Sequence, residues 1–216
     1  MALRRGLPLI AIAVLAGCGG GGGKHATGTS TDAHGCVAVT APAPKQRSEP
    51  KPRAQLDATK AYDVTLRTNC GSFTIRLDVK TSPATTASFV SLARRRYFDH
   101  TIFHRIVPGF VIQGGDPTAR GAGGPGYETV DKPPTGARYT HGVVAMAKTP
   151  TEAPGTAGSQ FFVVTGDDAR LPPDYAILGK VTKGLDVVDR IGALGDQQTE
   201  HPTETVEIER ATVTVR

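Results

Sequence analysis

Residues 62–79 alternate between apolar and polar side chains on both sides of a short turn, a pattern that an amphipathic helix does not produce. Apolar residues occupy every second position from Tyr62 to Leu66 and again from Phe73 to Val79. The sequence Asn69-Cys70-Gly71-Ser72 between them favours a turn. A period of two is typical of strands with one buried face, so we predict a β-hairpin here.

Further short runs rich in β-prone residues follow, separated by loops rich in glycine and proline. They span residues 103–107, 111–113, 142–147, 161–165, 177–182 and 206–215. Two segments have helical periodicity. Ser82-Pro83 supplies a cap and a first-turn proline for a helix that ends near Tyr97. Leu185, Val188 and Ile191 mark a second, short helix that Gly192 stops. Many short strands with two separated helices predict a mainly β fold, a closed antiparallel barrel with helical ends.

The amino terminus has the features of a secretory signal. Arg4 and Arg5 precede an apolar run over residues 7–16, which is about half of the roughly 20 residues that a bilayer-spanning helix needs. Leu15-Ala16-Gly17-Cys18 looks like a bacterial lipobox, which implies cleavage after residue 17 and a lipid on Cys18. The alternative is an ordinary signal with a chance cysteine.

The composition divides the rest of the chain in two. Residues 18–60 are rich in glycine, proline and polar residues, and Ala41-Pro42-Ala43-Pro44 and Glu49-Pro50-Lys51-Pro52 are typical of an extended spacer. We therefore expect a flexible tether over residues 18–60 and one folded domain over residues 61–216, long enough to bury a core.

The formal charge of +5 does not indicate a nucleic-acid partner, because the basic residues are scattered. Their one cluster, Arg94-Arg95-Arg96, closes the first predicted helix, where cations complement the helix dipole. We expect no nucleic-acid binding, and contact with a membrane only through the lipid.

Three cysteines occur, and Cys18 is assigned to the lipid. Cys36 and Cys70 remain as an even pair in an exported chain, which favours a disulfide between them. Two free thiols are the alternative. No His or Cys stands at metal-ligand spacing near them, so we expect no metal site.

The run from Phe103 to Asp116, Phe-His-Arg-Ile-Val-Pro-Gly-Phe-Val-Ile-Gln-Gly-Gly-Asp, places one arginine among apolar residues and follows it with a glutamine and a glycine turn. Such a surface suits a neutral, ring-shaped ligand that needs one strong hydrogen-bond donor. The run resembles the active-site signature of the cyclophilins, the peptidyl-prolyl cis-trans isomerases. Further matching motifs follow in order at 121–124, 142–147, 158–162 and 177–181, so the resemblance covers nearly all of residues 61–216. It implies a barrel of eight strands capped by two helices, and a monomeric enzyme without a cofactor.

The resemblance also implies roles for single residues. Arg105 falls on the catalytic arginine of the family, and Gln113 on the residue that orients it. The remaining implied contacts are the proline-pocket walls Phe110, Val111, Phe162 and Leu171, the main chain of Ala147 and Lys148, and the neighbouring groove at Gly121 and Gln160. Tyr175 replaces the pocket histidine of the family, and Arg170 replaces a tryptophan that contributes to binding cyclosporin. We therefore expect weak inhibition by cyclosporin.

Other readings of these residues fit less well. Gly121-Ala122-Gly123-Gly124-Pro125-Gly126 has the spacing of a dinucleotide-binding loop, but Pro125 and Gly126 do not open a helix. His100 and His104 flank Thr101-Ile102-Phe103, which is typical of a strand, and a spacing of four converges on a metal only in a helix. Ser159 lacks the sequence around a hydrolase nucleophile.

The sequence therefore predicts an exported, lipid-anchored prolyl isomerase on the outer face of a bacterial cytoplasmic membrane or on the periplasmic side. Its partners would be unfolded or flexible exported polypeptides that contain proline. A lipoprotein that binds such segments as a chaperone or scaffold, with incidental catalysis, would use the same pocket, so this alternative stays open.

Overall fold

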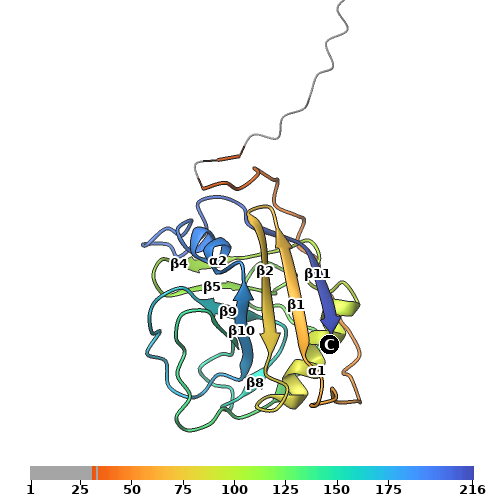
Figure 1. The fold of residues 1–216 in the computed structure, drawn as a ribbon. Helices are drawn as coiled ribbons and strands as arrows, with labels where there is room; N and C mark the ends of the chain where they lie inside the picture. Colours follow the sequence, from red (N-terminus) through yellow and green to blue (C-terminus); the bar gives the residue numbers. More distant parts are fainter. Residues whose placement is uncertain (1–30, 33) are drawn as a thin grey trace, which may run out of the picture.

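The computed structural model describes residues 31, 32 and 34–216, which form a curved β-sheet around a hydrophobic core (Figure 1). The predicted signal peptide at residues 1–17 and the lipidation site at Cys18 lie outside the described residues. In the described part of the chain, no helix is long and apolar enough to cross a bilayer.

Nine strands form the main sheet, in the order β3-β11-β1-β2-β10-β7-β9-β5-β4, and neighbouring strands are antiparallel. Their bounds are β1 Tyr62–Thr68, β2 Gly71–Leu77, β3 Thr101–Ile102, β4 Arg105–Val107, β5 Val111–Gly114, β7 Val143–Met146, β9 Phe161–Val164, β10 Ile177–Lys183 and β11 Glu207–Val215. A small second sheet pairs β6 (Thr129–Val130) with β8 (Thr156–Ala157). The helices are α1 (Pro83–Arg94) and α2 (Leu185–Gly192).

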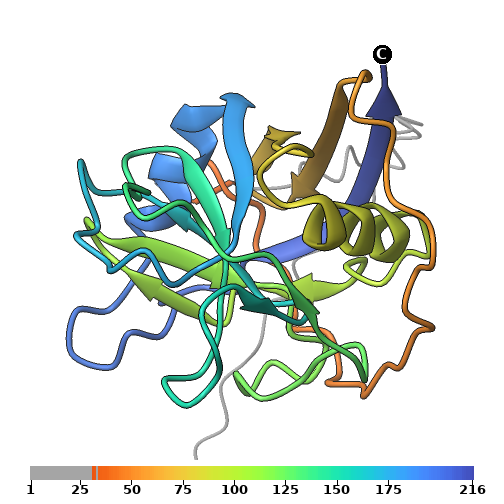
Figure 2. The same ribbon diagram turned by 90° about the horizontal axis from the view of Figure 1, so that it is seen from below.

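The predicted mainly β fold with two helices is confirmed, but the strand count and the closure of the sheet differ from the prediction. The main sheet has nine strands rather than eight, with the two-residue strand β3 at one edge. The edge strands β3 and β4 do not pair with each other, and an isolated bridge joins Ile102 of β3 to Asp116, just beyond β5. The sheet therefore curls around the core as a half-barrel without a continuous closing ladder (Figures 1 and 2).

The predicted hairpin consists of β1 and β2, which pair from Asp63 opposite Arg76 to Thr68 opposite Gly71. The apolar residues of the two strands alternate with polar ones because they face the core, where Val64 and Ile75 are fully buried. The apolar periodicity of residues 62–79 thus reports directly on which face of the sheet meets the core.

Strand β9 is buried on both faces, and this explains why all four of its residues are apolar. Phe161 and Val163 belong to the main core, whereas Phe162 and Val164 belong to a second, smaller apolar cluster. Successive side chains of a strand point to opposite faces, so this second cluster lies on the outer face of the sheet. It forms the base of the candidate site described below.

Ser82 occupies the N-cap position of helix α1 and Pro83 lies in its first turn, as predicted, but the expected side-chain cap does not form. The Ser82 hydroxyl makes no capping hydrogen bond. Instead, Oδ2 of Asp131 accepts a hydrogen bond of 2.6 Å from the backbone N–H of Thr85. A carboxylate satisfies this free donor and also complements the helix dipole. The residue that caps α1 is thus 46 positions away in sequence.

Residues 34–61 lie along the surface of the domain without a helix or a strand of more than one residue (Figures 1 and 2). We call residues 37–53 the strap. Its backbone donates hydrogen bonds from Lys45 to the carbonyl of Pro117 and from Glu49 to the carbonyl of Pro125, both 2.9 Å long. The described part of the predicted tether therefore contacts the loop that follows β5, while its flexibility stays a prediction.

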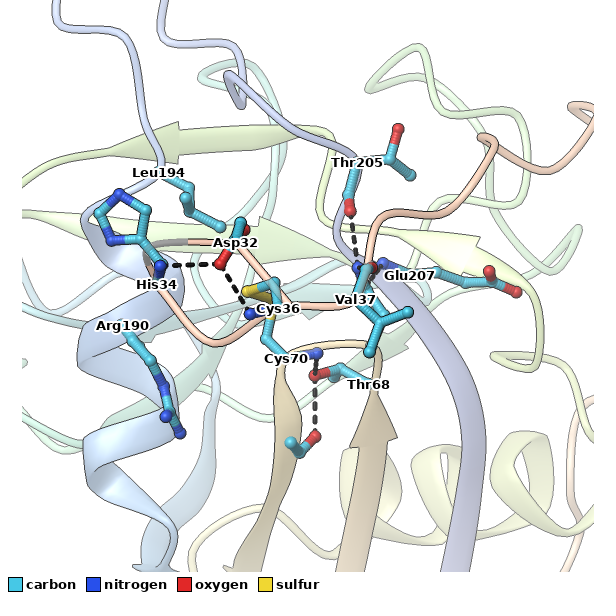
Figure 3. The surroundings of a disulfide bond; sticks show 12 residues. Asp32, His34, Cys36, Val37, Thr68, Cys70, Arg190, Leu194, Thr205 and Glu207 are labelled. Carbon is cyan, nitrogen blue, oxygen red and sulfur yellow. Dashed lines mark hydrogen bonds between the residues drawn. A yellow bond between two sulfur atoms is a disulfide. The ribbon is translucent and has the colours of Figure 1, made fainter. Parts of the chain in front are cut away.

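A disulfide joins Cys36 to Cys70, in agreement with the predicted pairing (Figure 3). Both cysteines are buried in the main core. The backbone N–H of Val37 donates to the carbonyl of Asn69 at 2.8 Å, and the Asn69 side-chain amide donates back to the carbonyl of Val37. The amino-terminal end of the strap is therefore fixed covalently and by hydrogen bonds to the turn between β1 and β2.

Candidate active site

The register of five neighbouring strands brings a cation, an amide and an aromatic ring into one row. Arg105 on β4 lies opposite Gln113 on β5, which lies opposite Phe162 on β9. The row continues through Ala145 on β7 to Ile177 on β10. Residues directly opposite one another have Cβ atoms about 4.5–5.5 Å apart and share one face of the sheet. The fold therefore places the Arg105 side chain beside the outer apolar cluster.

A pocket of about 230 Å³ opens on this face. Its lining residues are Arg105, Phe110, Val111, Gln113, Ala147, Lys148, Phe162, Leu171 and Tyr175, all of which the sequence placed in the site. The other two predicted contacts, Gly121 and Gln160, line a neighbouring pocket of about 630 Å³, which shares Gln113, Ala147 and Lys148 with the first. The structure thus brings the predicted residues together in two adjoining hollows.

The Arg105 guanidinium is held by two side chains at the rim of the smaller pocket. Its Nε donates to Oε2 of Glu200 at 2.7 Å, and its Nη1 makes a long hydrogen bond of 3.5 Å to Oε1 of Gln113. Gln113 in turn donates to Gln160 at 3.1 Å, and Gln160 donates to the carbonyl of Gly123 at 3.0 Å. About one third of the Arg105 side chain is exposed, so a ligand can reach the cation from the pocket.

The wall that carries Gly121 and Gly123 is organised by the buried carboxylate of Asp116. It accepts hydrogen bonds from the backbone N–H groups of Thr118 at 2.7 Å and of Gly123 at 3.1 Å. Burial alone would raise the pKa of Asp116, but these hydrogen bonds and that of the Thr118 hydroxyl outweigh it and hold the pKa below its usual value. A Cβ at Gly123 would come within 2.0 Å of Oδ1 of Asp116, so only glycine fits this close approach.

Tyr139, which no sequence pattern singled out, supports the wall of the smaller pocket that carries Tyr175. Its hydroxyl donates to the carbonyl of Tyr175 at 2.7 Å and accepts from the N–H of Tyr175 at 3.0 Å. The Tyr175 ring then meets Phe162 edge to face, with ring centroids 5.6 Å apart. Burial raises the pKa of Tyr139, so its hydroxyl stays protonated and can donate at neutral pH. No local pattern around Tyr139 marks it, because its partner is 36 residues away.

His104 and Ser159 are the two residues near the pocket whose surrounding sequence could suggest a metal ligand and a nucleophile, respectively. His104 precedes the candidate arginine, and burial lowers its pKa, which favours the neutral ring next to Arg105. Ser159 is buried, and its hydroxyl donates to the carbonyl of Gly115 at 2.7 Å, which does not suit a nucleophile. Among the described residues, no group of three His, Cys, Asp or Glu side chains is placed to hold a metal ion.

The smaller pocket offers apolar side chains for a compact ring and two cations. Arg105 stands at its rim, and the Nζ of Lys148 lies 5.6 Å from the centroid of the Tyr175 ring. The larger pocket offers glutamine side chains and backbone groups of a glycine-rich loop. Such a pair of hollows can accept an extended peptide, with a proline ring in the first and the preceding residues near the second.

Comparisons with known proteins agree with this geometry. The family model described as "Cyclophilin type peptidyl-prolyl cis-trans isomerase/CLD" matches residues 63–213. Peptidyl-prolyl cis-trans isomerase CYP18-2 of Arabidopsis thaliana is 38% identical over 155 residues, covering 70% of this chain and 93% of the plant protein. Peptidyl-prolyl cis-trans isomerase-like 1 of Neurospora crassa is 39% identical over 157 residues, covering 71% and 94% respectively.

Solved structures give the same result. The crystal structure of a cyclophilin-type peptidyl-prolyl cis-trans isomerase of Cryptosporidium parvum superposes with a TM-score of 0.66 at 29% identity, covering 71% of this chain and 98% of that one. A structure of the same parasite protein in the presence of the dipeptide Ala-Pro has a TM-score of 0.65. The chain therefore belongs to the cyclophilin family, and it is a peptidyl-prolyl cis-trans isomerase, EC 5.2.1.8.

Proposed function

We propose that this protein accelerates the isomerisation of X-Pro bonds in exported polypeptides, with Arg105 as its catalytic residue. The observation that carries the proposal is the position of the Arg105 guanidinium at the rim of a pocket whose walls include the aromatic rings of Phe110 and Phe162. The proline ring of a substrate would occupy this pocket, and its ring nitrogen would face Arg105.

The mechanism follows from the electronic structure of the imide bond. Resonance gives the bond partial double-bond character and a rotation barrier of about 18–20 kcal/mol. In the twisted transition state the proline nitrogen regains its lone pair and becomes a better hydrogen-bond acceptor. A guanidinium aimed at that nitrogen therefore binds the twisted state more strongly than either planar isomer, as catalysis requires. An acceleration of about four decades corresponds to about 5.5 kcal/mol.

Gln113 and Phe162 would support this step. Gln113 links the guanidinium to Gln160, so it restricts rotation of the Arg105 head group. Phe162 is 4% exposed and gives the ring an apolar surface in a fixed orientation. A bound peptide would cover the exposed part of Arg105 and strengthen its hydrogen bond by excluding water.

The proposal extends to the place where the enzyme acts. The basic and apolar amino terminus, followed by Leu15-Ala16-Gly17-Cys18, supports export and lipid attachment at Cys18. A disulfide between Cys36 and Cys70 supports an oxidising compartment. The enzyme would act as a monomer on the outer face of a bacterial cytoplasmic membrane. Loss of membrane association in a Cys18→Ser variant tests the anchor, and an unchanged membrane fraction would contradict it.

A proline-peptide isomerisation assay on the full-length chain tests the catalytic role. We expect Arg105→Ala to lower kcat/KM by about 100-fold or more, which corresponds to losing a charge-assisted bond made chiefly in the transition state. Arg67→Ala is the matched control, because Arg67 also pairs with a glutamate but does not line the pocket. An Arg105→Ala variant as active as the control would refute the proposed mechanism.

If the protein acts instead as a chaperone or scaffold that binds proline-containing segments, Arg105→Ala should have a different effect in cells. If the Arg105→Ala variant has lost isomerisation but still gives a deletion strain the wild-type phenotype, binding of proline-containing segments is the biological role. If the variant still binds the peptide but has lost isomerisation and no longer complements the deletion strain, catalysis is the biological role.

A further inference from the structure

Glu200 is the acidic side chain that contacts the Arg105 guanidinium. An arginine head group is a planar fork with five N–H donors, and its usefulness depends on which of them face the ligand. In this site Nε is bound by Oε2 of Glu200 at 2.7 Å, and Nη1 makes the longer bond to Gln113. The two acceptors approach different edges of the fork, so together they restrict its rotation and leave the remaining donors for the pocket.

The backbone of Glu200 is tied to the strand that carries Arg105. Its carbonyl accepts a hydrogen bond of 2.9 Å from the N–H of Ile106, the residue after Arg105 on β4. Its own N–H donates to the carbonyl of Asp196 at 2.9 Å. Glu200 has a φ of +59°, a left-handed conformation that non-glycine residues seldom adopt. Such a conformation persists only where the surrounding contacts determine it.

The loop around Glu200, residues 194–203, is itself built to lie against β4. A Cβ at Gly195 would come within 2.3 Å of the carbonyl oxygen of Ile106, so the close approach of the loop requires glycine there. The carboxylate of Asp196 accepts hydrogen bonds from the N–H groups of Gln198 at 3.0 Å and Thr199 at 2.8 Å. A bridge between Gly195 and Pro202 closes the base of the loop. The loop is therefore an ordered support rather than a chance neighbour of the arginine.

We propose that Glu200 is a positioning residue for isomerisation. Its carboxylate holds the Nε edge of Arg105, so that the N–H donors not used by Glu200 and Gln113 face the proline ring in the orientation that the twisted imide needs. This inference rests on the catalytic role proposed for Arg105. An ion pair that only stabilised the surface would leave the orientation of the guanidinium, and therefore kcat, unaffected.

Three glutamate variants of the full-length chain separate these possibilities. Glu200→Ala removes the acceptor, and Glu200→Gln keeps an oxygen that can accept from Nε but removes the charge. Glu209→Gln is the matched control, because Glu209 pairs with Nε of Arg67 at 2.8 Å and does not line the pocket. Thermal unfolding of each variant shows whether the fold is retained, as expected for a half-exposed loop side chain.

We expect Glu200→Ala to lower kcat by about 3- to 10-fold with KM changed by less than about twofold, because the contact acts chiefly on the transition state. Glu200→Gln should recover at least half of the lost kcat, and Glu209→Gln should match the unaltered protein. If both Glu200 variants match Glu209→Gln, or if Glu200→Ala raises kcat, the positioning role is refuted. If Arg105→Ala is itself fully active, the catalytic proposal fails first, so the two failures are distinguishable.

Discussion

The disulfide between Cys36 and Cys70 closes a covalent loop with a sequence separation of 34 residues, which contains the strap and β1. Replacing both cysteines by alanine opens this loop without leaving a new polar group in the core. On the chain-entropy model, a loop of this length contributes about 4 kcal/mol to the free energy of unfolding at 25 °C. For a chain of this size each kcal/mol shifts Tm by roughly 2–4 °C, so we expect Tm to fall by about 8–15 °C.

The strap should be released before the rest of the domain. It is held by backbone hydrogen bonds, such as those from Lys45 and Glu49, and by side-chain hydrogen bonds to backbone carbonyls of the domain. The side chains that make them are Gln46, Arg47 and Lys51. Each such bond contributes only about 0.5–1.5 kcal/mol net. Ordering each residue of the strap costs about 1–2 kcal/mol of backbone entropy, so these bonds alone do not keep the strap in place. Without the cross-link, trypsin should therefore cut after Lys45, Arg47 and Arg53 well before it cuts the sheet.

Thermal unfolding and limited trypsin digestion of the full-length chain check both effects. The unaltered protein treated with a thiol reductant should behave like the double alanine variant, and the variant should not respond to reductant. If the variant keeps the Tm of the oxidised protein and its strap resists trypsin equally, the disulfide does not hold the strap, and the reasoning is wrong.

Three further outcomes follow from the site. Tyr139→Phe removes both hydrogen bonds to the backbone of Tyr175, so urea denaturation should show a loss of about 1–3 kcal/mol, and an unchanged midpoint would contradict this support role. Because the folded pKa of Asp116 lies below its usual value of about 3.9, its contribution to stability is present above that pH and is lost as pH falls through the folded pKa. An Asp116→Asn variant should be less stable at pH 7 and show a shallower loss of stability below about pH 4, whereas parallel pH curves would contradict this role of the carboxylate. Finally, cyclosporin should inhibit this enzyme about 10-fold or more weakly than a relative with tryptophan at the position of Arg170, and an equal inhibition constant would refute that expectation.

The local parts of the structure could be predicted because their causes are local. A period of two along residues 62–79 is enough to place a hairpin, since only one face of each strand meets the core. Pro83 at the start of α1 also marks a helix limit through its own backbone preference, and Gly192 is the last residue of α2, where the sequence placed its end. The resemblance of the run around Arg105 to the cyclophilin signature indicated the pocket residues, and the structure places the arginine and the glutamine of that run opposite each other on the adjacent strands β4 and β5.

The rest depended on contacts between distant segments. Asp131 caps helix α1, and the Tyr139 hydroxyl holds the backbone of Tyr175. Glu200, which pairs with Arg105, is 95 residues away from it in sequence. Each of these side chains lies in a loop, where no periodic pattern reports what it faces. The amino-acid sequence by itself determined the mainly β class and the disulfide partners, because alternation, turn residues and the number of cysteines can be read along the chain, and the family resemblance indicated the residues that line the smaller pocket. Only the tertiary structure decided the open half-barrel and the residues that hold the arginine and the pocket walls in place, because those contacts form only when the sheet curls and brings remote loops together.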